Sequence, residues 1–126
     1  MCIRDSFLWF AEGFTSYYGP LTIRRAGEQS VDDYLRNLGG TLSRILNAPG
    51  RAIRSPRDMS LRAPFVDAAA AIDPTNNANT FVSYYPYGAM VALALDLSLR
   101  DKFENVSLDD YTVSYTHLTL PTIYSV

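Results

Sequence analysis

The sequence predicts a mainly α-helical protein, because apolar residues recur at three- and four-residue spacing in three long segments. These segments run from Phe7 to about Arg25, from Ser30 to about Pro49 and from Tyr84 to Arg100. Apolar residues at this spacing share one face of a helix, whereas the residues of a half-buried strand alternate. The 126 residues are enough for one domain with a modest core.

The first helix is expected to carry a broad aromatic face. Its members are Phe10, Phe14, Tyr17, Tyr18 and Leu21. Gly19-Pro20 interrupts this pattern, and proline lacks an amide hydrogen and clashes with the preceding helical turn. We therefore expect this pair to loosen or end the first part of the helix.

The second helix has the clearest start. Ser30 is a good N-cap, and Asp33 three residues later can complete a variant of the capping box. A heptad-like apolar stripe follows, formed by Val31, Tyr34, Leu35, Leu38, Leu42, Ile45 and Leu46. Gly39-Gly40 weakens the helix by about 1 kcal/mol per glycine, and we expect it to allow close packing of another backbone.

Residues 49–80 are expected to form a long and mostly irregular passage. Its punctuating prolines are Pro49, Pro56, Pro64 and Pro74. Its basic residues are Arg51, Arg54, Arg57 and Arg62. Solvated surface charge is the favoured interpretation of these arginines, ahead of a site for a substrate carboxylate or phosphate.

The third helix has apolar residues on more than one face, which predicts a central and largely buried helix. These residues are Met90, Val91, Leu93, Ala94, Leu95, Leu97 and Leu99. Ser107 to Asp110 then repeats the N-capping pattern of Ser30, so a further helix should begin there. The helical pattern breaks off soon after Tyr111.

The two ends of the chain differ from its middle. Residues 1–6 and 112–126 resemble translated sequencing-adapter sequence, so we expect a non-native leader, a partial domain over 7–111 and a non-native tail. The alternative for the tail is a real strand that begins at Val113, because the residues there alternate. His117, the only histidine, lies in this tail and is discounted as a metal ligand.

Composition excludes several classes of protein. Hydrophobic residues make up 48% and charged residues 19%, which is typical of a folded globular chain. The net charge of −2 gives no reason to expect nucleic acid or an anionic membrane as a partner. No apolar run approaches the roughly 18–20 residues that cross a bilayer. The single cysteine cannot form an internal disulfide.

Glu12 is the leading candidate for a residue with a chemical function. It lies in an aromatic string that runs from Leu8 to Gly19. A carboxylate among so many apolar neighbours needs a cation, a metal ion or hydrogen-bond donors to offset its desolvation. On composition alone, a surface glutamate or one with a structural partner remains the favoured interpretation.

The string around Glu12 is similar to the segment that supplies the third zinc ligand in glutamate-type zinc peptidases. Within that group the sequence resembles the glycyl aminopeptidase family most closely. The similarity continues through Leu21 to Gly27, Arg44 to Arg51, Val82 to Leu93, Leu95 to Arg100 and Ser107 to Asp110. It therefore extends over essentially all of the chain between the two end segments.

This resemblance implies a fold and a site. The fold would be the helical C-terminal lobe of a thermolysin-like (glutamate-type zincin) catalytic domain, with a PDZ domain downstream in these bacterial enzymes. Glu12 would be a zinc ligand. Tyr85, with Tyr84 as the fallback, would donate a hydrogen bond to the oxyanion of the tetrahedral intermediate, a role that suits an uncharged phenol.

No His-Glu-x-x-His motif occurs in the chain, so two zinc ligands and the general base that the resemblance implies are missing. We expect a parent protein that removes small amino-terminal residues from peptides, and a chain that by itself neither holds catalytic zinc tightly nor cleaves peptides. One alternative is a non-catalytic helical interaction module that kept the peptidase fold. Another is a piece of a related broad-specificity zinc aminopeptidase. Whether the compartment is cytoplasmic or periplasmic does not follow from these residues.

Overall fold

The computed structural model describes residues 5–65 and 74–119. The structure is 81% helical, and no strand occurs in the described ranges, which confirms the prediction of a mainly α protein. No helix in these ranges combines the length and the apolar content of a membrane span. The chain divides into two compact units, residues 1–91 and 92–126.

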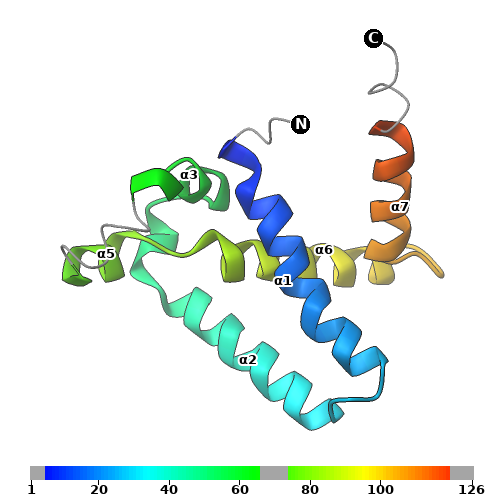
Figure 1. The fold of residues 1–126 in the computed structure, drawn as a ribbon. Coiled ribbons are helices and arrows are strands. Elements are labelled where there is room, and N and C mark those ends of the chain that lie inside the picture. Colours follow the sequence, from blue (N-terminus) through cyan, green and yellow to red (C-terminus); the bar gives the residue numbers. More distant parts are fainter. Residues whose placement is uncertain (1–4, 66–73, 120–126) are drawn as a thin grey trace. The chain divides into compact units, whose positions relative to one another are not determined.

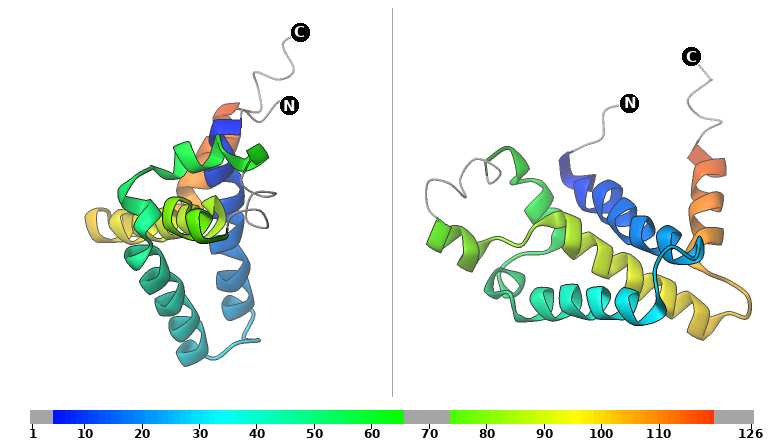
Figure 2. Two further views of the ribbon diagram at one scale, coloured as in Figure 1. Left: turned by 90° about the vertical axis from the view of Figure 1, so that its left-hand side faces the viewer. Right: turned by 60° about the horizontal axis from the view of Figure 1, so that its bottom comes forward.

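The first unit is built around two long helices, α1 and α2, and the start of a third, α6 (Figure 1). In chain order its elements are η1 (Asp5–Phe7), α1 (Leu8–Arg25), α2 (Val31–Asn47), η2 (Pro49–Ala52), α3 (Pro56–Ser60), α5 (Pro74–Thr80) and the first part of α6 (Tyr84–Lys102). A short connection joins α1 and α2 into a helical hairpin, which Figure 2 shows from two further directions.

The expectation was that Gly19-Pro20 loosens or ends the first part of the helix; α1 runs through Pro20, so the second alternative is wrong. Gly19 has no Cβ to meet the proline ring, which relieves the clash that a residue before proline usually suffers. The helix ends instead at Arg25, and Gly27 follows its C-cap with a φ of +84°, a conformation that favours glycine. The amide of Gly27 donates to the carbonyl of Arg24 at 3.1 Å, and the amide of Glu28 donates to that of Ile23 at 3.2 Å.

Helix α2 begins as predicted, with Ser30 as its N-cap. The Ser30 Oγ accepts a hydrogen bond from the Asp33 amide at 3.1 Å and donates one to the Asp33 carboxylate at 2.7 Å. Of the apolar stripe, Ile45 is buried. Several other members are exposed by between 39% and 55%: Val31, Leu35, Leu42 and Leu46. A Cβ added at Gly39 or Gly40 would meet nothing within 4 Å, so the expected close approach of another backbone there is wrong.

The passage from 49 to 80 is more regular than expected, because it contains η2, α3 and α5. Ser55 caps α3 with a full capping box: its Oγ accepts from the Asp58 amide, and the Asp58 carboxylate accepts from the Ser55 amide. Ser60 at the end of α3 is fully buried. Its Oγ accepts from the Trp9 amide at 2.9 Å and so ties α3 to the start of α1.

Helix α6 starts at Tyr84 as predicted, but it is buried mainly in its first half. Gly88, Ala89, Met90 and Ala92 are buried. Leu97 is 57% exposed, so the expectation of a largely buried helix is wrong for the second half.

The second unit consists of the remainder of α6 and of α7 (Leu108–Thr119). Ser107 precedes α7 as predicted, and its amide and hydroxyl both donate to the Asp110 carboxylate, at 2.9 and 3.0 Å. The Leu108 amide donates to the buried Asp96 carboxylate at 2.7 Å. Because α7 continues to Thr119, both the expected abrupt stop and the alternative strand at Val113 are wrong.

Candidate functional site

The two segments that carry the predicted site residues meet at a crossing of α1 and α6 (Figure 1). Gly13 and Gly88 form the contact. A Cβ added at Gly13 would lie 2.5 Å from the Cα of Gly88, and a Cβ added at Gly88 would overlap the carbonyl oxygen of Trp9. The two backbones therefore touch, and neither position has room for a side chain.

This contact brings together residues that are more than seventy positions apart in the sequence. Glu12 precedes Gly13 directly on α1. Tyr85 precedes Gly88 by less than one turn of α6, a rise of about 4.5 Å along the helix axis. The crossing therefore holds the predicted metal ligand and the predicted oxyanion donor on adjoining turns of two touching helices.

The Glu12 carboxylate makes no hydrogen bond or ion pair with any residue in the part of the chain that the structure describes. Glu12 is half-buried. A half-buried carboxylate without an intramolecular donor keeps its oxygens available to an outside partner. A metal ligand must have available oxygens, so the prediction that Glu12 is a metal ligand requires an unpaired carboxylate of this kind.

The two candidate tyrosines differ in their exposure. Tyr84 is buried, at 5%, whereas Tyr85 is 42% exposed. Their rings stack with centroids 4.8 Å apart. Tyr85 is therefore the more accessible of the two from solvent, and the ring of the buried Tyr84 packs against it.

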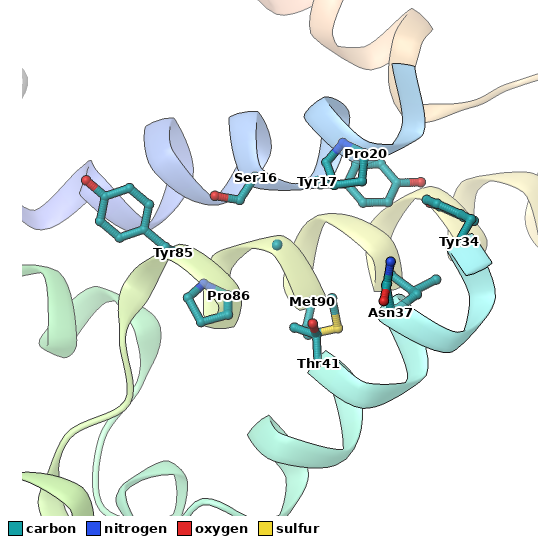
Figure 3. A pocket seen from close by; sticks show the side chains of 11 residues that line it. Ser16, Tyr17, Pro20, Tyr34, Asn37, Thr41, Tyr85, Pro86 and Met90 are labelled. Atoms are coloured by element: carbon teal, nitrogen blue, oxygen red, sulfur yellow. The ribbon is translucent and has the colours of Figure 1, made fainter. Parts of the chain in front are cut away.

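A cavity of about 230 Å³ adjoins this crossing (Figure 3). Its walls come from α1, α2 and the start of α6. They include Ser16, Tyr17, Tyr34, Asn37, Tyr85 and Met90. Ser16 lies four residues after Glu12, on the same face of α1. The cavity thus begins one helical turn from the predicted metal ligand and has Tyr85 in its wall.

Neither the cavity nor the crossing of α1 and α6 was predicted from the sequence. Nothing in the sequence marks Asn37 or Tyr34 as lining a cavity, because both residues are ordinary members of an amphipathic helix. Gly13 and Gly88 could have given one, since a glycine inside a strongly helical pattern indicates a close backbone contact. A close backbone contact was expected instead at Gly39-Gly40, where an added Cβ would meet nothing within 4 Å.

Within the described ranges, the side chains do not by themselves form a site for a zinc ion. Structural and catalytic zinc sites take three or four protein ligands. In the described ranges no group of three histidine, cysteine, aspartate or glutamate side chains lies close enough together to hold a metal. His117 belongs to α7, and its side chain lies outside the described part. Glu12 can contribute one ligand and no more.

Two touching helices that present a free carboxylate and an accessible phenol beside a cavity are consistent with a peptidase. The profile of the M61 glycyl aminopeptidase family matches residues 3–91, which is more than half of the chain. The chain therefore belongs to the glycyl aminopeptidase family, whose members are in general metallopeptidases. No curated protein and no solved structure matches it.

Proposed function

We propose that this chain forms part of the catalytic domain of a zinc aminopeptidase that removes small amino-terminal residues from peptides. The observation that carries the proposal is the contact between Gly13 and Gly88, which places Glu12 and Tyr85 on adjoining turns of two helices. Membership in the glycyl aminopeptidase family supports it. A PDZ domain downstream is part of the proposal and rests on the resemblance alone.

Glu12 supplies one carboxylate to a metal site whose other ligands belong to a His-Glu-x-x-His segment of the parent protein. A zinc ion with an open coordination position supplies Lewis acidity for peptide hydrolysis. A single carboxylate cannot replace three ligands. The 126-residue chain alone should therefore contain no stoichiometric zinc and have no aminopeptidase activity.

Tyr85 acts on the peptide itself. Its hydroxyl donates a hydrogen bond to the carbonyl oxygen of the scissile peptide as that oxygen gains negative charge. A donor that is already in position stabilises the developing charge without a cost of reorganisation. Exposure of 42% and a place in the cavity wall make Tyr85 suitable for this role.

The test uses the complete protein that contains this chain, assayed with the p-nitroanilides of glycine and alanine and analysed for zinc by atomic absorption. Glu12→Gln should remove both zinc and activity. Tyr85→Phe should retain zinc and lower kcat by about 10²–10³ fold, the usual loss for one oxyanion donor. Glu28→Gln, in the exposed connection between α1 and α2, is the matched control and should change neither. Full zinc content and full activity in Glu12→Gln would refute the assignment.

The exposed apolar stripe on α2 favours a second candidate, a helical interaction module without chemistry. Contiguous apolar surface of this kind often marks a protein interaction site. The two candidates separate in the same assay. A complete protein that binds no zinc and cleaves no anilide favours the interaction module.

A further inference from the structure

The cavity beside the α1–α6 crossing is large enough for an amino-acid side chain. Its volume is about 230 Å³. Apolar cavities of about 150 Å³ bind benzene, so this one accommodates an aromatic ring or a large aliphatic group. The side chain of a glycine or alanine residue would leave most of the space unfilled.

The chemistry of the walls is mainly apolar with a few polar groups. Tyr17, Leu38 and Met90 contribute ring, aliphatic and thioether surface. Ser16 and Asn37 contribute a hydroxyl and an amide, and Figure 3 shows both side chains facing the space between the three helices. An apolar pocket with a few convergent polar groups is the usual form of a small-ligand site.

Asn37 is the most informative of the polar residues. Within the described part of the chain its side-chain amide makes no hydrogen bond. A carboxamide presents a donor and an acceptor side by side, and a peptide group offers the complementary pair. Asn37 is exposed, so an extended peptide can reach its amide from solvent.

We infer that this cavity binds an aromatic or large aliphatic side chain of the peptide substrate, at a position after its small amino-terminal residue, while Asn37 hydrogen-bonds the peptide backbone. The inference rests on the proposed function, because Tyr85 belongs both to the cavity wall and to the proposed catalytic site. The cavity is then a second determinant of substrate specificity, in addition to the preference for a small first residue. The preferred peptide has a small first residue and a bulky apolar residue further along.

The first test measures binding alone, on the 126-residue chain. N-acetyl-phenylalaninamide is titrated into the chain, and the methyl resonances of Ala89 and Met90 are followed by NMR. These resonances should shift, and N-acetylglycinamide should bind at least about tenfold more weakly. Thr41→Leu, which fills the cavity from α2, should weaken phenylalaninamide binding about tenfold or more. Ser43→Leu, on the exposed side of α2, is the matched control and should bind as the wild type does.

The second test measures selectivity in the complete protein. The ratio of kcat/KM for Gly-Phe-Ala over Gly-Gly-Ala should be well above one and should fall about tenfold in Thr41→Leu. Asn37→Ala provides a second variant at an exposed position and should lower kcat/KM for Gly-Phe-Ala about fivefold. Circular dichroism confirms that each variant is folded.

The outcomes separate the inference from the proposed function. Absence of phenylalaninamide binding overturns the inference, whatever the complete protein does. An active complete protein whose selectivity is unchanged in Thr41→Leu and Asn37→Ala overturns the inference and leaves the proposed function standing. A complete protein without aminopeptidase activity on any peptide overturns both.

Discussion

Replacement of Gly13 by alanine tests the helix crossing on which the candidate site depends. Gly13 lies inside α1, where alanine is intrinsically favoured over glycine by about 1 kcal/mol. Helix propensity alone therefore predicts that Gly13→Ala stabilises the protein. The structure predicts the opposite sign, because the added methyl group has nowhere to go.

The magnitude follows from the contact distance. The new Cβ would lie 2.5 Å from the Cα of Gly88, and ordinary van der Waals contact begins at 3.4 Å. The helices must therefore separate by about 0.9 Å, and both groups in contact are backbone, which cannot rotate away. Overpacking of this kind costs about 1–3 kcal/mol. After the gain of about 1 kcal/mol in helix propensity, we expect a net loss of up to about 2 kcal/mol and no net stabilisation.

The assay is urea denaturation followed by circular dichroism at 222 nm. Gly40→Ala is the matched control, because Gly40 also lies inside a helix but has nothing within 4 Å of an added Cβ. Gly40→Ala should raise the free energy of unfolding by about 0.5–1 kcal/mol. If Gly13→Ala were as stabilising as Gly40→Ala, the α1–α6 contact would not exist as described.

Three further predictions concern other parts of the chain. Asp96→Ala should cost about 1–3 kcal/mol, because it leaves the buried Leu108 amide without its acceptor, and hydrogen exchange at Leu108 should accelerate. The hydrogen bonds from the Ser55 hydroxyl and amide hold the pKa of Asp58 below its ordinary value. A lowered pKa contributes stability above the unfolded-state value and loses it as the pH falls through the folded-state value. Ser55→Ala should therefore raise the pKa of Asp58 in a carbon-13 NMR titration, and an unchanged midpoint would contradict this cause. Leu46→Gln, in the exposed stripe of α2, should lower the fluorescence of bound anilinonaphthalene sulfonate, whereas equal fluorescence would mean that the stripe is covered.

Much of the helical architecture follows from local sequence signals. Ser30 and Ser107 were expected to precede helices, and both do so, because an N-cap depends only on residues within one turn. The starts of the helices at Leu8 and Tyr84 also agree with the apolar spacing. Local patterns were sufficient wherever the stabilising contacts are local.

The predictions that proved wrong concern elements whose contacts join residues far apart in the sequence, or whose stability is finely balanced. The short helix α3 depends partly on the hydrogen bond between Ser60 and Trp9, which are 51 positions apart. Gly19-Pro20 was expected to loosen or end the first part of α1, yet the helix continues through Pro20, so one missing amide did not outweigh the rest of the helix. The exposure of Leu35 could not be read from its spacing, because periodicity identifies an apolar face and not what covers it.

The residues of the candidate site come from the resemblance, and their arrangement in space comes from the structure. The resemblance indicated Glu12 and Tyr85, but only the structure shows that their helices touch at Gly13 and Gly88. The cavity requires side chains from α1, α2 and α6 together, so no single stretch of sequence could predict it. Asn37 is one of the cavity residues that the sequence alone could not identify.

The most direct measurement of the central claim is a cross-link between positions 12 and 85. Glu12→Cys and Tyr85→Cys are combined in a Cys2→Ser background and treated with a short bismaleimide, and the product is mapped by mass spectrometry. We expect an intramolecular cross-link in high yield. The pair Glu28→Cys and Tyr85→Cys should give none, because position 28 lies beyond Arg25, the last residue of α1, which is about 20 Å along the helix from position 12 at about 1.5 Å per residue. Equal yields for the two pairs, or none for the first, would contradict a shared site for Glu12 and Tyr85.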